Sequence, residues 1–336
     1  MAMNEKKYCV LGATSFGGRS VIEYLLNEGK NVQAIARREL PTKPFVINSK
    51  NTSNLQWVVS DLVLNTKKMI SAINEFEPDY IIDFMGQGMV AQSWIFPDHW
   101  YSTNVAKKSE LINGLKWENY LNKYIRISTP EVFGSVDEKI TEQHPFNPST
   151  PYALSHATID QHLKLKHNES GFPYIISRYA NFYGPGQQIY RIIPKALFFA
   201  LSNQKLTLEG GGVSERAFIY KDDIISSLKA IVEHGRIGES YHFSEAKCVS
   251  IKSLTEQIAR CCGISFENFT IMGAERIGKD QRYFMSARKA HSSLGWLPNV
   301  SLKNGILETM RWISDSKEFI RPHFLNYQHI FRDSYE

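Results

Sequence analysis

The opening of the chain constrains the fold more than any other stretch. An apolar run, YCVLG at 8–12, stops at a glycine, and the loop GATSFGG at 12–18 leads into an amphipathic segment that ends at Gly29. This order predicts a buried strand, a tight turn and a helix. Glycines let the turn close sharply, and the free N–H groups of the helix N-terminus favour a bound phosphate. We therefore expect a dinucleotide-binding turn, with an ordinary strand–helix turn as the alternative.

The rest of the first half repeats this alternation. Further strands are predicted by the apolar runs at 32–36, 55–62, 80–86, 124–130 and 174–180. A helical stretch lies near 66–76. Continuous β-branched runs between helices are typical of a parallel sheet covered on both faces. Right-handed crossovers then give an α/β, doubly wound fold of the Rossmann type.

The alternation of strands and helices ends at about residue 182, after which glycine-rich loops flank a helical segment, KALFFALS. We expect a dinucleotide-binding domain over 1–181, to which 216–245 returns, and a smaller C-terminal substrate-binding lobe over 182–215 and 246–336. Ligands of such folds bind beyond the carboxyl ends of the strands.

Composition narrows the function. The 336 residues carry a formal charge of +5 without a basic run of five or more, so a nucleic-acid partner is not expected and anionic ligands are mildly favoured. The four cysteines show neither metal-ligand spacing nor a disulfide framework, which predicts no metal and a reducing cytoplasm. The N-terminus lacks the apolar run of a secretory signal, and the longest apolar stretches are too short for a membrane span.

The residues after the second predicted strand bear on cofactor choice. Arg37 and Arg38 stand where an NAD-selective enzyme usually has an acidic residue. Two guanidinium groups suit a 2′-phosphate, so we predict NADP, with NAD as second choice; arginines that only solubilise the surface are the alternative. The predicted cofactor contacts are Gly12, Thr14, Ser15, Phe16, Gly18, Arg37, Arg38, Asp61, Leu62, Met85, Gly86, Gln87, Tyr152 and His156.

The sequence YALSH at 152–156 carries the predicted chemistry. Thr150 can cap a helix that Pro151 opens, and Tyr152 and His156 then share one face. A phenolate could take the proton of a hydroxyl group as hydride leaves the carbon. His156 could bond the ribose, and we expect it to be partly protonated at neutral pH. A structural histidine beside an idle tyrosine is the alternative.

Taken in order, six motifs resemble those of the extended short-chain dehydrogenase/reductases, and most closely those of the nucleotide-sugar 4,6-dehydratases that act on dTDP-glucose or GDP-mannose. The motifs are GATSFGG (12–18), STPEVFG (128–134), PYALSH (151–156), RYANFYGPG (178–186), ERAFIYKDD (215–223) and DQRYFMSARKAHSSLGW (280–296). The family has Tyr-x-x-x-Lys where this chain has Tyr-x-x-x-His.

The resemblance implies roles for four residues. Tyr152 would be the base for C4 oxidation, Thr129 would donate to the sugar oxygen, and His156 would bond the ribose. Glu131 would remove the C5 proton and protonate the departing C6 hydroxyl. Pro130 replaces an aspartate of the dTDP-glucose relatives, whereas the GDP-mannose relatives have serine there. The implied substrate contacts are Gln87, Thr129, Asn181, Arg191, Arg216 and Arg282.

The resemblance also implies that Asn104 braces a strand against the active site, with a helix-surface amide as the alternative. We therefore predict an NADP-dependent nucleotide-sugar 4,6-dehydratase that works through a 4-keto intermediate, as a cytoplasmic homodimer. A 4-oxidoreductase, epimerase or decarboxylase of the same family stays open, as does a non-catalytic dinucleotide-binding sensor. The aromatic tail, 318–336, is expected to pack on the fold or to contact a second subunit.

Overall fold

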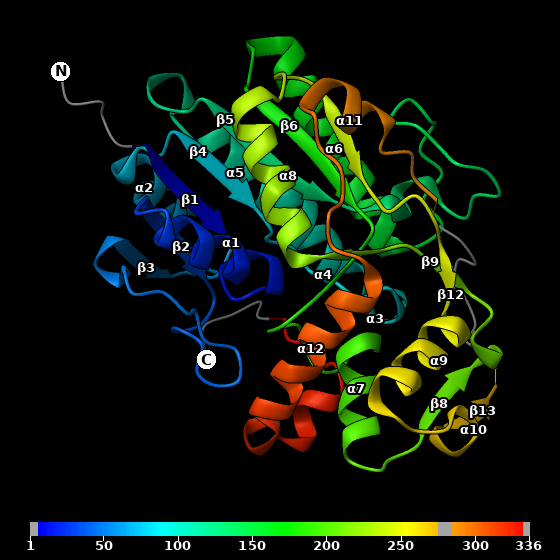
Figure 1. The fold of residues 1–336 in the computed structure, drawn as a ribbon. Helices are drawn as coiled ribbons and strands as arrows, with labels where there is room; N and C mark the ends of the chain where they lie inside the picture. Colours follow the sequence, from blue (N-terminus) through cyan, green and yellow to red (C-terminus); the bar gives the residue numbers. More distant parts are fainter. Residues whose placement is uncertain (1–5, 275–283, 332–336) are drawn as a thin grey trace.

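A seven-stranded parallel sheet forms the centre of the computed structural model, which describes residues 6–274 and 284–331 (Figure 1). The strand order is β11-β6-β5-β4-β1-β2-β3. The strands are β1 (Lys7–Leu11), β2 (Asn31–Ala36), β3 (Leu55–Val59), β4 (Tyr80–Asp83), β5 (Lys123–Ser128), β6 (Tyr174–Tyr179) and β11 (Ser240–Phe243). The chain order reverses between β1 and β4, and ligands of doubly wound sheets bind at such a switch point.

Side chains alternate along each strand, so the sheet buries two separate apolar layers. Tyr8 and Val10 of β1 pack into one layer, and Cys9 and Leu11 pack into the other. The first layer is covered by α1 (Phe16–Asn27), α8 (Lys221–His234) and α11 (Arg288–Leu294). The second is covered by α2 (Thr66–Phe76), α5 (Lys108–Gly114) and α6 (Pro151–Ser170). Figure 1 shows α1 and α8 in front of the sheet and α5 and α6 behind it.

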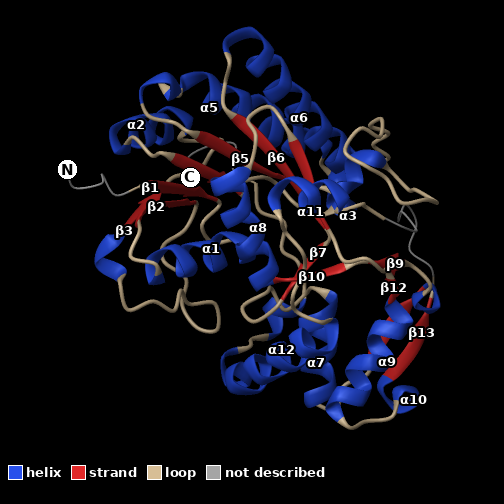
Figure 2. Ribbon diagram, turned by 45° about the horizontal axis from the view of Figure 1, so that its top comes forward, coloured by secondary structure: helices blue, strands red, loops and turns tan. Residues whose placement is uncertain are grey.

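A third apolar cluster lies apart from the sheet, among α7, α9 and α12 on one side of the molecule (Figure 2). Its helices are α7 (Ile192–Leu201), α9 (Ile251–Cys262), α10 (Phe266–Phe269) and α12 (Leu302–Ser316). The short strand pairs there are β7 (Asn181–Tyr183) with β10 (Phe218–Tyr220), β8 (Leu206–Glu209) with β13 (Thr270–Gly273), and β9 (Glu215–Arg216) with β12 (Val249–Ser250). The division into 1–181 with 216–245, and 182–215 with 246–336, remains our proposal; α11, from the second set, packs on α8 and β11.

The predicted strands and helices are confirmed. Each of the six apolar runs forms a strand of the sheet, and the amphipathic segment expected to end at Gly29 forms α1. The predicted fold class, a doubly wound parallel sheet, is therefore correct.

Several short helices connect β4 to α5, namely α3 (Val90–Ile95), α4 (Pro97–Tyr101) and a π-helical turn, η2 (Ser102–Lys107). A 3₁₀ turn, η4 (Pro130–Phe133), follows β5. The π turn is a feature that the sequence did not predict. Such single turns occur often at functional sites, because they redirect the side chains around them. Here the turn places Asn104, which is 0% exposed, inside the fold.

Candidate active site

The turn after β1 is shaped for close approach of a ligand. Gly12 has a φ of +75°, and a Cβ at this position would lie 2.8 Å from the backbone nitrogen of Met85. Only glycine therefore fits. Ser15 caps α1, because its Oγ accepts a hydrogen bond from the Gly18 amide at 3.0 Å. The first-turn N–H groups of a helix have no acceptor within it, so the turn fits the pyrophosphate of a dinucleotide.

Apart from Tyr152 and His156 on α6, the predicted cofactor contacts lie at the carboxyl ends of four neighbouring strands. Thr14 lies in the turn after β1 and Phe16 opens α1, and Arg37 and Arg38 follow β2 and are exposed. Asp61 and Leu62 follow β3, and Met85, Gly86 and Gln87 follow β4. The Asp61 carboxylate accepts a hydrogen bond from the Val63 amide at 2.8 Å, and Leu62 packs in the second apolar layer. Both thus have local structural contacts as well.

Asn104 ties the loop after β4 to α6. Its Oδ1 accepts a hydrogen bond from the Gln87 amide at 2.6 Å, and its Nδ2 donates to the Gln87 carbonyl at 3.1 Å and to the Ser155 hydroxyl at 3.0 Å. The alternative of a helix-surface amide is thus wrong, since the side chain is buried.

The C-terminal tail reaches the same place. The Ile330 carbonyl accepts hydrogen bonds from Arg37 Nη1 at 3.0 Å and from Gln87 Nε2 at 2.9 Å. Beside it, the His329 ring stacks on Trp100, with centroids 5.0 Å apart, and bonds His99 at 2.8 Å. One carbonyl of the tail therefore joins two residues that the sequence predicts to hold the cofactor.

Tyr152, Thr129 and Glu131 come together between β5 and α6. Thr129 follows β5 and caps η4, and Tyr152 lies in the first turn of α6. Burial raises the pKa of Tyr152 well above its usual range, and the nearby charge of Glu131 raises it further. A hydrogen bond with Thr129, and the charges of Arg191 and Arg126, act in the opposite direction. The phenol, the hydroxyl and the carboxylate thus share one site.

His156 lies behind this group, with its ring 4.6 Å from the Tyr152 ring between centroids. Burial, followed by the charges of Arg126, Lys108 and Arg178, lowers the pKa of His156 well below its usual range. The expectation of partial protonation at neutral pH is therefore wrong: the imidazole is neutral.

A buried charge network surrounds His156, and the sequence reasoning missed it. Asp83 at the end of β4 accepts from Lys108 Nζ at 2.7 Å and from the Tyr124 hydroxyl at 2.7 Å. Arg126 Nη1 lies 3.7 Å from the same carboxylate, and Arg126 Nη2 lies 3.1 Å from His156 Nδ1. The sequence could have revealed it, because Asp83 and Arg126 are charged residues within apolar strands. In a sheet covered on both faces, such a charge must be paired.

A second buried pair lies next to it, and it too was missed. Asp160 of α6 accepts from Arg178 Nη2 at 2.7 Å and from the Ser128 hydroxyl at 2.6 Å. The pair joins α6 to β5 and β6, and so fixes the helix that carries Tyr152.

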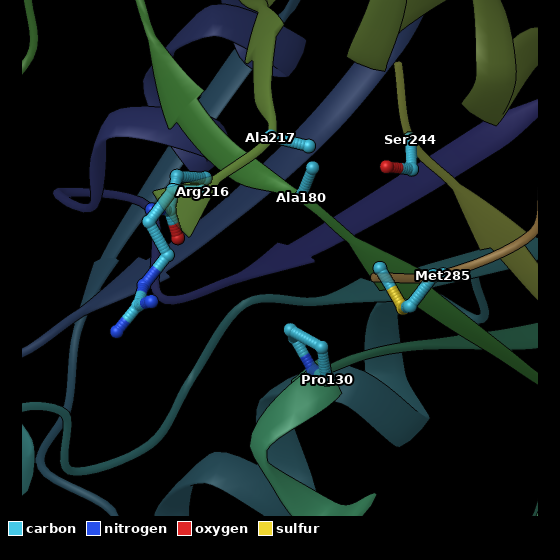
Figure 3. A pocket seen from close by; sticks show the side chains of 7 residues that line it. Pro130, Ala180, Arg216, Ala217, Ser244 and Met285 are labelled. Atoms are coloured by element: carbon cyan, nitrogen blue, oxygen red, sulfur yellow. The ribbon is translucent and has the colours of Figure 1, made fainter. Parts of the chain in front are cut away.

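A small, partly open pocket is lined by Pro130, the residue between Thr129 and Glu131 in the chain. Figure 3 shows Pro130 facing Ala180 and Ala217 across this pocket, with Met285 and Ser244 to one side. The other residues that line it are Asn181 and Arg216, two of the predicted substrate contacts.

The remaining predicted substrate contacts are placed differently. Arg191 is exposed, lies 5.4 Å over the Tyr190 ring, and is near enough to lower the pKa of Tyr152. Gln87 follows β4, among the predicted cofactor contacts. Arg282 lies outside the described residues.

Among residues 6–274 and 284–331, no helix has the length and apolar character of a membrane span. Within the same ranges no cluster of three or more His, Cys, Asp or Glu side chains is arranged to bind a metal ion.

Comparisons with known proteins show the family of this chain. The model of the NAD dependent epimerase/dehydratase family matches residues 8–243. A dTDP-D-glucose 4,6-dehydratase of Homo sapiens is 27% identical over 321 residues, which cover 93% of this chain and 91% of that protein. The low-salt glycan biosynthesis protein Agl12 of Haloferax volcanii is 27% identical over 300 residues, 88% of this chain and 95% of that protein.

Solved structures of dehydratases and epimerases are similar to this chain in fold. DesIV, a dTDP-glucose 4,6-dehydratase from Streptomyces venezuelae with NAD bound, is similar with a TM-score of 0.84 and 25% identity, over 94% of this chain and 99% of that one. A UDP-glucose 4-epimerase from Thermotoga maritima has a TM-score of 0.85 at 21% identity, over 93% of this chain and 99% of that one; this likeness is one of fold.

Proposed function

This chain belongs to the NAD dependent epimerase/dehydratase family, and from that premise we propose that it is a nucleotide-sugar 4,6-dehydratase that works through a 4-keto intermediate. The observation that carries the proposal is the meeting of Tyr152, Thr129 and Glu131 at one site. The similarity to dTDP-glucose 4,6-dehydratases over nine-tenths of the chain supports it.

Each of the three side chains has a task. Tyr152, as phenolate, takes the proton of the C4 hydroxyl, and Thr129 holds the oxygen by a hydrogen bond. A nicotinamide held at this end of the sheet would supply the hydride chemistry that the oxidation and the later reduction need. The 4-ketone acidifies the C5 proton, which Glu131 removes and passes to the departing C6 hydroxyl. The proton leaves in the released water, so C5 takes its new proton from the solvent.

Pro130 limits which acid can take part. The resemblance to the dTDP-glucose dehydratases implies an aspartate at position 130. In this chain the position is Pro130, whose ring lines the pocket. Glu131 must therefore serve first as the base and then as the acid, which a single carboxylate can do because it gains the C5 proton before the hydroxyl departs.

We propose NADP as the cofactor, with NAD as the second choice. Arg37 and Arg38 are exposed at the end of β2, where the adenosine ribose of a dinucleotide lies in such folds. Both guanidinium groups can bond a 2′-phosphate. Calorimetric titration of the protein with NADP and with NAD tests this choice: tighter binding of NADP, lost in Arg37→Ala/Arg38→Ala, supports it, and tighter binding of NAD contradicts it.

The substrate is proposed to be a nucleotide diphospho-sugar. Asn181 and Arg216 line the pocket beside Pro130, and Arg191 lies close enough to Tyr152 to lower its pKa, which supports a role of these side chains as donors to a diphosphate. Arg282 stays in the proposal as a further donor.

We also propose a cytoplasmic homodimer. Apolar side chains on α3 and α6, two helices that pack side by side, are exposed and support a subunit contact: Trp94, Ile95, Leu154 and Leu165.

Incubation of the purified protein with NADP or NAD and a panel of dTDP-, UDP- and GDP-hexoses tests the reaction. The expected product is lighter than its substrate by one water. An epimerase would give a product of unchanged mass, a net oxidation one lighter by two hydrogens, and a decarboxylation one lighter by carbon dioxide. A dinucleotide sensor would bind cofactor and change no sugar. Each of these outcomes contradicts the dehydratase.

A further inference from the structure

The histidine in the Tyr-x-x-x-His arrangement has a partner that fixes its chemistry. Arg126 of β5 is 1% exposed, and its Nη2 lies 3.1 Å from His156 Nδ1. Every polar hydrogen of a guanidinium is a donor, and the group has no acceptor. Nδ1 must therefore accept, so the ring carries its single proton on Nε2. His156 is thus a neutral imidazole whose Nε2–H is the one donor it can offer.

The charges behind the ring do not balance. Asp83 is the carboxylate of the network, and it faces two cations, Lys108 at 2.7 Å and Arg126 at 3.7 Å. Arg178, which also faces His156, is paired with Asp160 at 2.7 Å. Three cations face two carboxylates while Lys108 is protonated, so one positive charge is then in excess next to His156; burial lowers the pKa of Lys108 to about 8, so the excess is present at neutral pH and is lost in alkali. In a buried site, where the dielectric constant is low, such a charge acts strongly on its neighbours.

Tyr152 is the ionisable neighbour on the other side of the ring, 4.6 Å from it between centroids. The groups that face the phenol are Thr129 and Glu131 after β5, Arg191 before α7, and Arg126 of β5. Glu131 opposes ionisation of the phenol. Arg191 lowers the pKa of Tyr152 more than Arg126 does, but Arg191 is exposed, so solvent and salt screen its charge, whereas the charge of Arg126 is buried.

We propose that Arg126 is a positioning residue that acts through His156: its N–H locks the ring as an Nε2–H donor, and its permanent charge stabilises the phenolate of Tyr152. The pair divides between two side chains what a single lysine does in Tyr-x-x-x-Lys, with the donor on α6 and the charge on β5. The inference rests on the proposed function only in taking Tyr152 as the base.

A titration of the phenol tests the charge. The ultraviolet difference spectrum of the protein with oxidised cofactor bound, minus that of Tyr152→Phe, reports ionisation of Tyr152 alone. Arg126→Gln removes the charge and keeps an amide donor, and we expect it to move the midpoint upward by about one pH unit, a tenfold loss of phenolate below the midpoint. Arg126→Lys keeps a charge and should stay near the wild type. Arg19→Gln, which also removes a buried arginine, should not move it.

An unchanged midpoint in Arg126→Gln, or an equal shift in Arg19→Gln, would overturn the inference. A second measurement needs no variant. Nitrogen-15 NMR of the wild-type protein should show His156 as a neutral ring with protonated Nε2 throughout the neutral pH range; a protonated Nδ1 overturns the proposal. Neither readout needs a sugar substrate, so failure of the dehydratase assay leaves them valid, and their failure in an active dehydratase removes only the role of Arg126.

Discussion

At the scale of single residues, the exchange of lysine for histidine leaves a site that can still work. The ring of His156 brings no charge, because burial and three cations keep it neutral. The charge comes from Arg126 on the neighbouring strand. The carboxylate of Glu131 and the hydroxyl of Thr129 lie beside Tyr152, so the groups that we propose for oxidation and elimination are together.

Glu131→Gln should separate the two halves of the reaction. The amide cannot take the C5 proton, so water loss should fall by about 10²-fold or more, while oxidation at C4 by Tyr152 continues. Mass spectrometry of quenched reactions should then show a keto sugar, lighter than the substrate by two hydrogens, in place of the dehydrated product. Glu138→Gln, on an exposed carboxylate seven residues on, is the control and should act as the wild type. Equal loss of both steps would contradict this division of roles.

Asp83→Asn should destabilise the fold in a pH-dependent way. Although burial favours the neutral acid, Lys108 and Arg126 hold the pKa of Asp83 below its usual value. A lowered folded-state pKa gives stability that is present above the unfolded pKa and is lost as the pH falls through the folded pKa. We expect a loss of about 3–5 kcal/mol at neutral pH, because two buried cations lose their counter-charge.

Chemical denaturation at a series of pH values measures this difference, which should narrow in acid. Asp79→Asn is the matched control: its partner Lys6 is 52% exposed, so the expected cost is below about 1 kcal/mol. Equal losses of unfolding free energy in the two variants would show that the buried network stabilises the fold no more than an exposed ion pair does.

At the scale of elements, one amide joins the loop after β4 to α6. Asn104 in the π turn bonds both backbone groups of Gln87 and the hydroxyl of Ser155 on α6. Any change in the π turn would therefore move the loop after β4 relative to Tyr152.

Asn104→Leu should lower stability by about 2–4 kcal/mol, because three hydrogen bonds are lost, each worth about 1 kcal/mol, and buried groups of Gln87 and Ser155 lose their partner. Thermal denaturation checks the stability, and fluorescence titration should show weaker cofactor binding. Asn122→Ala, which removes an exposed hydrogen bond to Asp79, serves as the control. A stability near that of the wild type would mean that the brace is dispensable.

Much of the secondary structure could be predicted from the sequence, because it depends on residues that are neighbours along the chain. Glycine at 12, the apolar runs and the helix caps of α1 and α6 are set by neighbours along the chain, so pattern and spacing reveal them. The Arg126–His156 contact and the π turn depend on residues that meet only in three dimensions. A charge within a buried strand indicates that a partner exists, but not which one.

At the scale of the whole molecule, the last described residues return to the cofactor end of the sheet. Tyr327 packs on Tyr190 with centroids 5.6 Å apart, and the Ile330 carbonyl takes donors from Arg37 and Gln87. The expected packing role of the tail is thus only part of what it does, since its backbone also uses groups predicted for the cofactor.

Removal of residues 327–336 should therefore strengthen dinucleotide binding. The donors of Arg37 and Gln87 become available, and one hydrogen bond of about 1 kcal/mol corresponds to an affinity gain of about fivefold. Calorimetric titration of the shortened protein checks this. Tyr327→Phe, which keeps the ring contact with Tyr190, should bind as the full chain does. Unchanged or weaker binding after truncation would contradict competition between tail and cofactor.

Turnover in heavy water, followed by mass spectrometry and proton NMR of the product, tests most directly whether Tyr152, Thr129 and Glu131 act as one site. The predicted product has lost one water from C5 and C6 and carries one solvent deuterium at C5, and Tyr152→Phe abolishes its formation. A sugar nucleotide that keeps all its oxygen atoms, or loses water equally fast in Tyr152→Phe, would contradict the proposed chemistry.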